Sequence, residues 1–195
     1  TVSAMPQKGI LLDAGCGDGY YTAAVTEALQ SSGKDVQVYG VDISKYAVDL
    51  AARHCRAASF AVGSVFHLPV SDHCCDGLIS LFAPYAGTEF QRVLKPGGVM
   101  ILGIPAARHL IGLKQAIYDT PYENAVKPYA LEGFSFIGKR TIETVISLPN
   151  QTAIQNLFAM TPYYYKTGQK EQARLAELET LETEIAFELL QYQKE

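Results

Sequence analysis

The feature that most constrains the fold of this chain is a glycine-rich turn between an apolar segment and a helical one. The turn, residues 13–19 (DAGCGDG), follows the apolar run 9–12 and precedes a helical pattern that Gly33 ends. Glycine lacks a Cβ, so the backbone of such a turn can pass close to a ligand. We call residues 13–19 the glycine turn. It predicts a strand, a ligand-binding loop and a helix in succession.

Apolar strands and helical segments keep alternating through the first two thirds of the chain. A run without polar alternation is typical of a parallel strand covered on both faces. This order predicts an α/β fold, in which a parallel sheet has helices on both faces. The predicted elements are strand 9–14, helix 20–32, strand 36–42, helix 44–55, strand 59–62, strand 77–82, helix 88–94, a turn at 95–98 and strand 99–105.

The last third of the chain has a different pattern. Leucines at the end of the chain leave a helix as an alternative to the last predicted strand. We expect one domain over residues 1–195, with 1–120 as the cofactor-binding half and 121–195 as substrate-side and C-terminal sheet elements. The predicted elements are a polar loop at 121–128, strand 134–147, helix 152–159, helix 169–181 and strand 182–192.

Composition excludes several classes of protein. Apolar residues make up 48% of the chain, which excludes a disordered chain. No apolar run approaches the roughly 18 residues of a membrane span. The first residues show neither a signal peptide nor an initial Met, so we expect a cytoplasmic protein, no membrane partner, and a fragment of a longer chain. The formal net charge is −4 and no dense Lys/Arg run is present, so a nucleic-acid partner would need extra positive surface.

The cysteines and histidines do not form a metal-binding pattern. The four cysteines lack a C-x-x-C pair, and adjacent Cys74 and Cys75 have poor spacing for zinc. Three of the four histidines also have no paired ligand spacing. We therefore expect reduced, mostly buried thiols and no metal within this chain.

Acidic residues around the glycine turn indicate the ligand. A dinucleotide site would place its third glycine at position 20, which is Tyr20. Asp13 and Asp18 bracket the turn; they would repel a pyrophosphate but suit a ligand that carries an amine and a sulfonium. Asp42 ends the second strand, where a carboxylate can accept the hydroxyls of a ribose, and Ile43 can pack on adenine. These features favour S-adenosylmethionine (SAM) over NAD.

Further stretches resemble class I SAM-dependent methyltransferases over residues 9–105. Ser64 and Val65 follow the third strand, where polar groups can contact the adenine edge, and LKPGG at 94–98 is the turn before the fifth strand in many such enzymes. The resemblance implies a Rossmann-like, mostly parallel seven-stranded sheet with helices on both faces.

The whole chain resembles the bacterial 23S rRNA guanine-N1 methyltransferases. Four stretches carry this match: 11–22 (LLDAGCGDGYYT), 81–84 (LFAP), 105–114 (PAARHLIGLK) and 160–163 (MTPY). The resemblance implies methyl transfer from SAM to N1 of a guanine in a 23S rRNA hairpin. That family carries an N-terminal zinc module that helps to hold the hairpin. This sequence lacks the module, so we expect RNA binding to need it; a homodimer stays open.

The resemblance also implies that Tyr21, Thr22 and His109 approach the methyl donor. The candidate donor-binding residues are therefore Asp13, Gly15, Cys16, Gly17, Gly19, Tyr21, Thr22, Asp42, Ile43, Ser64, Val65 and His109.

The polar candidates for catalysis are His109 and Tyr85. Guanine N1 is a poor nucleophile while it is protonated, so a base, or a hydrogen-bond donor to O6, should act near the methyl group. His109 is either that base or a hydrogen-bond partner of the carboxylate of the donor. Phe82 and Tyr163 are candidates for stacking on the base, and basic residues, among them Arg108 and Lys114, for contacting phosphates.

Two other functions remain alternatives at this stage. One is a class I methyltransferase that acts on a small molecule, with residues 107–128 as a lid. The other is a SAM-binding module without catalysis. An NAD-binding oxidoreductase fits less well because of the two acidic residues that flank the glycine turn.

Overall fold

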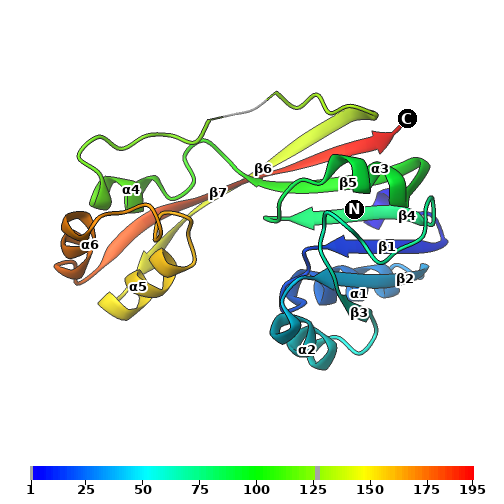
Figure 1. The fold of residues 1–195 in the computed structure, drawn as a ribbon, viewed down its shortest axis with the longest axis horizontal. Coiled ribbons are helices and arrows are strands. Elements are labelled where there is room, and N and C mark those ends of the chain that lie inside the picture. Colours follow the sequence, from blue (N-terminus) through cyan, green and yellow to red (C-terminus); the bar gives the residue numbers. More distant parts are fainter. Residues whose placement is uncertain (1, 126–127) are drawn as a thin grey trace. The chain divides into compact units, whose positions relative to one another are not determined.

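The structure is a computed structural model that describes residues 2–125 and 128–195 (Figure 1). Residues 126 and 127 of the expected loop at 121–128 lie outside the described residues. The chain divides into two compact units, and the expected division near residue 120 stays a prediction. The first unit contains Thr1–Ile104, Pro128–Arg140 and Leu189–Glu195, and the second contains Pro105–Lys127 and Thr141–Glu188.

Within residues 2–125 and 128–195, seven strands form one sheet, as predicted. The parallel pairs β1/β2, β1/β4, β2/β3 and β4/β5 make most of it parallel, and one antiparallel hairpin makes it mixed. The strand order is β3-β2-β1-β4-β5-β7-β6 (Figure 1). The strands are β1 (Lys8–Ala14), β2 (Asp35–Asp42), β3 (Ser59–Val62), β4 (Cys75–Leu81), β5 (Leu94–Pro105), β6 (Phe134–Leu148) and β7 (Leu181–Lys194).

The helices start where capping chemistry allows. Ser44 precedes α2, and its hydroxyl accepts the backbone N–H of Ala47, as expected of an N-cap. A short 3-10 helix, Val2–Ala4, precedes β1. The α-helices are α1 (Tyr20–Ser31), α2 (Lys45–His54), α3 (Gly87–Val93), α4 (Ile111–Ile117), α5 (Gln151–Ala159) and α6 (Gln169–Ala176).

Three details differ from the sequence predictions. The strand β5 begins at Leu94, directly after α3, whereas a turn was expected at 95–98. Cys75 pairs with Leu94 and Gly77 with Val99, so the residues between are accommodated as an irregularity within the paired strand. The helix α6 ends at Ala176 rather than near 181, because Leu181 already begins β7. The helix α4 was not predicted.

The core of the first unit has two sides because neighbouring residues of a strand point to opposite faces. Leu11, Ile79 and Ile101 pack in one cluster, which includes Leu29 of α1. Their neighbours Leu12, Leu78, Met100 and Leu102 pack in another cluster, which includes Phe90 and Val93 of α3 and also Phe134, Leu190 and Tyr192 of β6 and β7. The predicted covering of both faces by helices is therefore confirmed.

The core of the second unit is smaller and is built from its three helices. Leu110, Leu113 and Ile117 pack with Ile154 and Phe158 of α5, and the same cluster contains Leu148 of β6 and Leu175 of α6. The segment that follows β5 is thus anchored by the apolar side chains that α4 contributes to this cluster.

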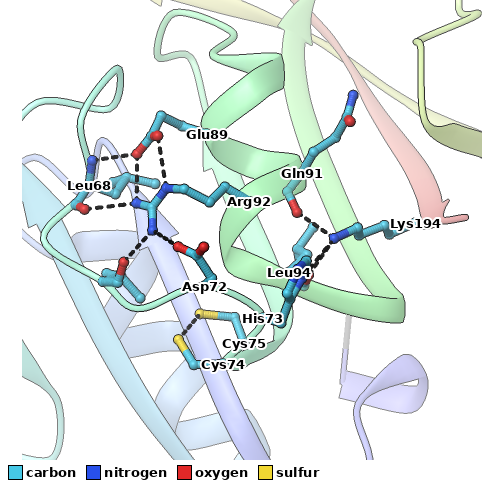
Figure 2. Close-up of polar contacts among 11 residues, drawn as sticks. Leu68, Asp72, His73, Cys74, Cys75, Glu89, Gln91, Arg92, Leu94 and Lys194 are labelled. Atoms are coloured by element: carbon cyan, nitrogen blue, oxygen red, sulfur yellow. Dashed lines mark hydrogen bonds and ion pairs between the residues drawn. The ribbon is translucent and has the colours of Figure 1, made fainter.

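The segment between β3 and β4 contains no helix and is held by Arg92 of α3 (Figure 2). The Arg92 guanidinium donates to the carbonyls of Leu68 and Val70, and it pairs with Asp72 at 2.7 Å and with Glu89 at 2.8 Å. The hydrogen bond from Arg92 lowers the pKa of Glu89 to about 2. This network fixes the backbone that leads from Ser64 toward β4.

Candidate functional site

The glycine turn lies between the end of β1 and the start of α1. Its backbone needs glycine at two positions in particular. Gly15 has φ 87°, and a Cβ there would lie 2.4 Å from the Cβ of Ala83. Gly17 has φ 56°, and nothing lies within 4 Å of a Cβ built on it. Positive φ disfavours any side chain, so both positions keep the turn compact and open to a ligand.

Asp42 at the end of β2 is bound to the glycine turn. Its Oδ2 accepts the Gly17 N–H at 2.9 Å, and its Oδ1 accepts the Ser44 N–H at 2.9 Å. These bonds orient the carboxylate, and each oxygen keeps a lone pair for a further donor. Asp42 thus lies beside the turn, while its predicted contact with a ribose stays a prediction.

Asp13 is buried directly beneath the turn. It is 2% exposed, and Thr22 donates a hydrogen bond to its Oδ2 at 2.6 Å. Burial raises the pKa of Asp13 to about 6, against the opposing effect of the Thr22 hydrogen bond. Burial also raises the pKa of Cys16 to about 12, so this thiol stays protonated. Asp13 and Thr22 thus form a buried acidic support for the turn rather than an exposed ligand contact.

A cavity of about 310 Å³ lies beside Gly15 at the carboxyl edge of the sheet. The predicted residues Gly15, Asp42, Ile43, Ser64, Val65 and Phe82 all line it. The site prediction missed Phe66, Leu81, Ala83 and Pro84, although the LFAP stretch could have indicated three of them. Ligands of open parallel sheets bind at this edge, so the cavity is the candidate site for the donor.

Aromatic rings stand next to this cavity. Phe82 has φ 63°, and its N–H donates to the Gly103 carbonyl at 3.0 Å, which holds that strained backbone. The Phe82 ring lies 6.0 Å from the ring of Tyr21, which in turn lies 5.2 Å from that of Tyr20. All three rings are exposed. They give this edge a surface on which a flat, unstacked base can pack.

Tyr85, a predicted catalytic residue, lies against α3. Its ring contacts that of Phe90 edge-on at 5.7 Å, and burial raises the pKa of its hydroxyl. It is not among the residues that line the 310 Å³ cavity. A catalytic role for Tyr85 stays a prediction.

The other predicted substrate and catalytic residues belong to the second unit. Arg108 pairs with Glu123 at 3.3 Å and with Glu184 at 3.4 Å, so carboxylates of the same unit already face its charge. Tyr163 is half-buried, with its hydroxyl 3.5 Å from Asn124 Oδ1. Burial raises the pKa of Tyr163 to about 12.

His109 and Lys114 occupy the segment that follows β5. We call residues 105–117 the His109 segment. Ala186 donates its backbone N–H to His109 Nδ1 at 3.2 Å, and the imidazole lies 4.4 Å from the Phe187 ring. Lys114 is fully buried, and its Nζ donates to the Tyr122 carbonyl at 3.0 Å and to Asn124 Oδ1 at 2.7 Å. The expectation that Lys114 contacts phosphates is therefore wrong, because its ammonium is enclosed.

Other features of the described chain give no competing site. A cavity of about 370 Å³ on the face of β1, β2 and β3 is lined mainly by apolar side chains such as Leu12, Val41 and Val70, and no charged group converges on it. Within residues 2–125 and 128–195, no three His, Cys, Asp or Glu side chains gather as metal ligands. None of the described helices combines the length and apolar character that a membrane span needs.

The sequence is similar to known methyltransferases. A family model described as a methyltransferase domain matches residues 11–98. The chain is 28% identical to "Putative 23S rRNA (guanine-N(1)-)-methyltransferase YxjB" of Bacillus subtilis, over 92% of this chain and 65% of the relative. It is 30% identical to the 23S rRNA (guanine(748)-N(1))-methyltransferase of Streptomyces fradiae, over 86% of this chain and 60% of the relative. The chain thus spans less than two thirds of these relatives.

A different class of relative matches a shorter part of the chain. The malonyl-[acyl-carrier protein] O-methyltransferase of Serratia marcescens is 30% identical over 61% of this chain and 47% of the relative.

Solved structures share the fold at low sequence identity. A "putative methyltransferase" of Bacillus halodurans C-125 has a TM-score of 0.65 and 13% identity, over 99% of this chain and 95% of that one. A [4+2]-cyclase, SpnF, has a TM-score of 0.60 and 18% identity, over 99% of this chain and 78% of that one. These neighbours confirm the expected class I methyltransferase fold. The cyclase illustrates that the fold alone does not determine the reaction.

Proposed function

This chain is a class I SAM-dependent methyltransferase in its fold and its matched domain, and from that premise we propose that it methylates N1 of a guanine in a 23S rRNA hairpin. The observation that supports an rRNA acceptor is the extent of the sequence match. Similarity to the two rRNA methyltransferases covers 92% and 86% of the chain, whereas the malonyl-carrier relative matches 61%. The similarity to the rRNA relatives therefore extends beyond the SAM-binding half of the chain.

The donor cavity fits SAM. The Asp42 carboxylate is oriented by two backbone N–H groups and retains acceptor capacity for the ribose hydroxyls. Ile43 and Val65 supply apolar surface for adenine in the same cavity. Asp13, beneath the turn, gives a negative potential that suits the cationic amine and sulfonium. When bound, SAM supplies a methyl group attached to a sulfonium, which is a good leaving group.

The residues of the chain then need mainly to align the acceptor. In-line displacement requires little covalent help, and correct alignment can lower a barrier by roughly 7–11 kcal/mol. A guanine in a duplex must leave its stack before N1 can approach a methyl group. We propose that Phe82 and Tyr21 stack on the extruded base, since both rings are exposed beside the cavity.

Primer extension on 23S rRNA tests this function. The chain is incubated with SAM and deproteinised 23S rRNA, and stops of reverse transcriptase are mapped, because N1-methylguanine blocks base pairing. The expected result is one strong new stop at a guanine in a hairpin. The family that the chain resembles holds the hairpin with a zinc module, so we expect slow turnover and a long incubation.

A small-molecule acceptor is the second candidate, and the malonyl-carrier relative favours it. Radiolabelled methyl transfer to a malonyl-carrier protein and to 23S rRNA, measured side by side, separates the two. Label in the carrier protein with none in RNA would contradict the rRNA proposal and leave SAM-dependent methyl transfer in place.

A further inference from the structure

The adjacent residues Cys74 and Cys75 place two thiols side by side. Both cysteines are free, and their Sγ atoms lie 3.6 Å apart and point toward one another (Figure 2). Neighbouring side chains within a strand point to opposite faces, which would keep two such thiols apart. The strand β4 begins only at Cys75, so Cys74 lies outside the strand and its thiol can turn toward that of its neighbour.

Hydrogen bonds fix the backbone on both sides of this pair. The His73 N–H donates to the Arg92 carbonyl at 2.8 Å, and His73 Nδ1 lies 3.1 Å from the Leu94 carbonyl oxygen. Further upstream, the Arg92 guanidinium donates to the Val70 carbonyl at 2.7 Å. Downstream, Cys75 pairs with Leu94 of β5. The two sulfurs are therefore presented by a segment that is anchored before and after them.

Both cysteines line the cavity of about 370 Å³ on the face of β1, β2 and β3. Pro69 and Val70, from the segment between β3 and β4, line it together with the apolar side chains of the three strands. No charged residue is among the described residues that line it. Cys75 is buried, while Cys74 is partly exposed, so a molecule in this cavity has the two thiols at its wall and apolar surface around it.

The number and state of the sulfurs limit what the pair can bind. No third His, Cys, Asp or Glu of the described ranges joins them, whereas Zn²⁺ takes three or four protein ligands. A two-coordinate soft cation prefers sulfurs on its opposite sides, and two adjacent residues do not offer that arrangement. Burial raises the pKa of the Cys75 thiol, so the pair does not present two thiolates to a cation.

We propose that Cys74 and Cys75 bind a monosubstituted trivalent arsenical, whose apolar carbon substituent lies in the 370 Å³ cavity. Trivalent arsenic is a soft centre that forms two bonds to sulfur at an angle and keeps its third bond to carbon. The thiols make the covalent attachment, and the apolar walls favour a large substituent over a small one. The inference does not depend on the proposed rRNA acceptor, because none of these residues lines the donor cavity.

The binding step needs no oxidant and no reductant. With an arsenoxide, the arsenic–oxygen double bond breaks and two S–As bonds form. The two thiol protons leave with the oxygen as one molecule of water. Arsenic stays trivalent and both sulfurs keep the oxidation state of a thiol. The product is a neutral ring, which suits a cavity without charged residues.

Phenylarsine oxide, titrated into phosphine-reduced protein, tests the covalent part of the proposal. We expect one adduct per chain by mass spectrometry, with Cys74 and Cys75 both protected from alkylation. Cys74→Ser leaves one sulfur and should weaken binding roughly 100-fold, because the second S–As bond forms at a high effective concentration. Cys55→Ala removes a cysteine that does not line the cavity and serves as the matched control. Equal affinity in Cys74→Ser and the unmodified chain would overturn the proposal.

Thermal unfolding tests whether the folded cavity contributes. The unfolded chain keeps the same adjacent thiols, so a ligand raises Tm only if it binds the folded state more tightly. Phenylarsine oxide should raise Tm, since its ring is buried only in the folded chain. Methylarsonous acid carries a single methyl group, and the folded chain should prefer the phenyl compound roughly tenfold. An unchanged or lower Tm with phenylarsine oxide would overturn the assignment of the cavity.

A filled cavity gives the sharpest control. Ala61 on β3 lines the cavity and is exposed, so Ala61→Phe occupies the proposed space and leaves both thiols in place. The adjacent exposed Val62 does not line it, and Val62→Phe adds a ring at the same strand without filling the cavity. Only Ala61→Phe should lose the preference for phenyl over methyl. If Ala61→Phe does not fold, Ala61→Leu replaces it. An equal preference in the Ala61 and Val62 variants would contradict the proposal.

Discussion

The glycine turn after β1 and the His109 segment after β5 both follow the carboxyl end of a parallel strand, but their chemistry is opposite. The glycine turn uses positive-φ glycines and two carboxylates, Asp13 and Asp42, which create a site for a cation. The His109 segment instead encloses a lysine ammonium and an imidazole, each held by hydrogen bonds within the second unit. The glycine turn thus keeps its backbone and an oriented carboxylate open to a ligand, whereas the His109 segment buries its charged group.

The largest expected effect comes from removing the carboxylate that orders the glycine turn. Asp42→Ala removes the acceptor of the Gly17 N–H and the proposed partner of the ribose, so SAM affinity should fall roughly 100-fold. Isothermal titration measures this. Asp49→Ala, which breaks only an exposed ion pair with Arg53, is the matched control. Equal SAM affinity in both variants would remove Asp42 from the site.

In the His109 segment, removal of the buried Lys114 ammonium should lower the stability of the protein. Lys114→Met leaves Asn124 Oδ1 and the Tyr122 carbonyl without their buried donor, and the free energy of unfolding should fall by about 2 kcal/mol. Urea denaturation measures this, with the exposed Lys170→Met as control. A loss no greater than that of the control would show that the buried ammonium is not a structural anchor.

A pair of glycines separates the ligand role of the turn from its folding role. Gly17 and Gly33 both have positive φ, and a Cβ on either meets nothing within 4 Å. Each change to alanine should cost about 1 kcal/mol of stability. Only Gly17→Ala should also weaken SAM binding, by roughly tenfold, since its Cβ would enter the proposed ligand space. Matching affinities in the two variants would mean that the donor does not approach the turn.

The smallest effect is a pH dependence of donor affinity. Burial raises the pKa of Asp13 to about 6, so its carboxylate is ionised above pH 6 and neutral below. Affinity for cationic SAM should therefore rise roughly threefold between pH 5 and 7. Since the folded pKa lies above the ordinary value of 3.8, the stability contribution of Asp13 should fall as pH rises from about 4 to 6.

Two threonines of α1 refine this prediction. Thr22→Val removes the hydrogen bond that lowers the pKa of Asp13, so the inflection should move above pH 6. Thr26→Val removes a buried bond to the Thr22 carbonyl and should leave the inflection in place. Calorimetric titration of SAM over a pH series measures both. A common inflection in the two variants would assign the pH dependence to another group.

The two segments also show which contacts a sequence can reveal. The glycine turn was predictable because its partners are close along the chain: Thr22 lies 9 residues from Asp13, and Asp42 lies 25 from Gly17. The hydrogen bond that orients the imidazole of His109 comes from the backbone N–H of Ala186, 77 residues away on β7. A family resemblance could point to His109, but no local pattern could show which of its nitrogens accepts this hydrogen bond.

Two further differences have the same cause. Lys114 is followed closely by a polar loop, and its sequence context is that of an exposed residue; its burial depends on Asn124 and Tyr122 folding over it. The residues between Leu94 and Val99 include Pro96 and adjacent glycines, which are typical of a turn, but pairing with β4 holds them in β5. In both cases tertiary contacts override the local preference.

The strand β7 has a consequence for how this protein is made. Leu190 and Tyr192 complete the buried core of the first unit, and Lys194 donates to the carbonyls of Gln91 and Leu94 (Figure 2). A nascent polypeptide can form the glycine turn and its acidic partners early in translation. It cannot close the hydrophobic core around them until residues 189–194 have emerged from the exit tunnel, so an apolar face of the half-finished sheet stays in contact with water or chaperones until that point.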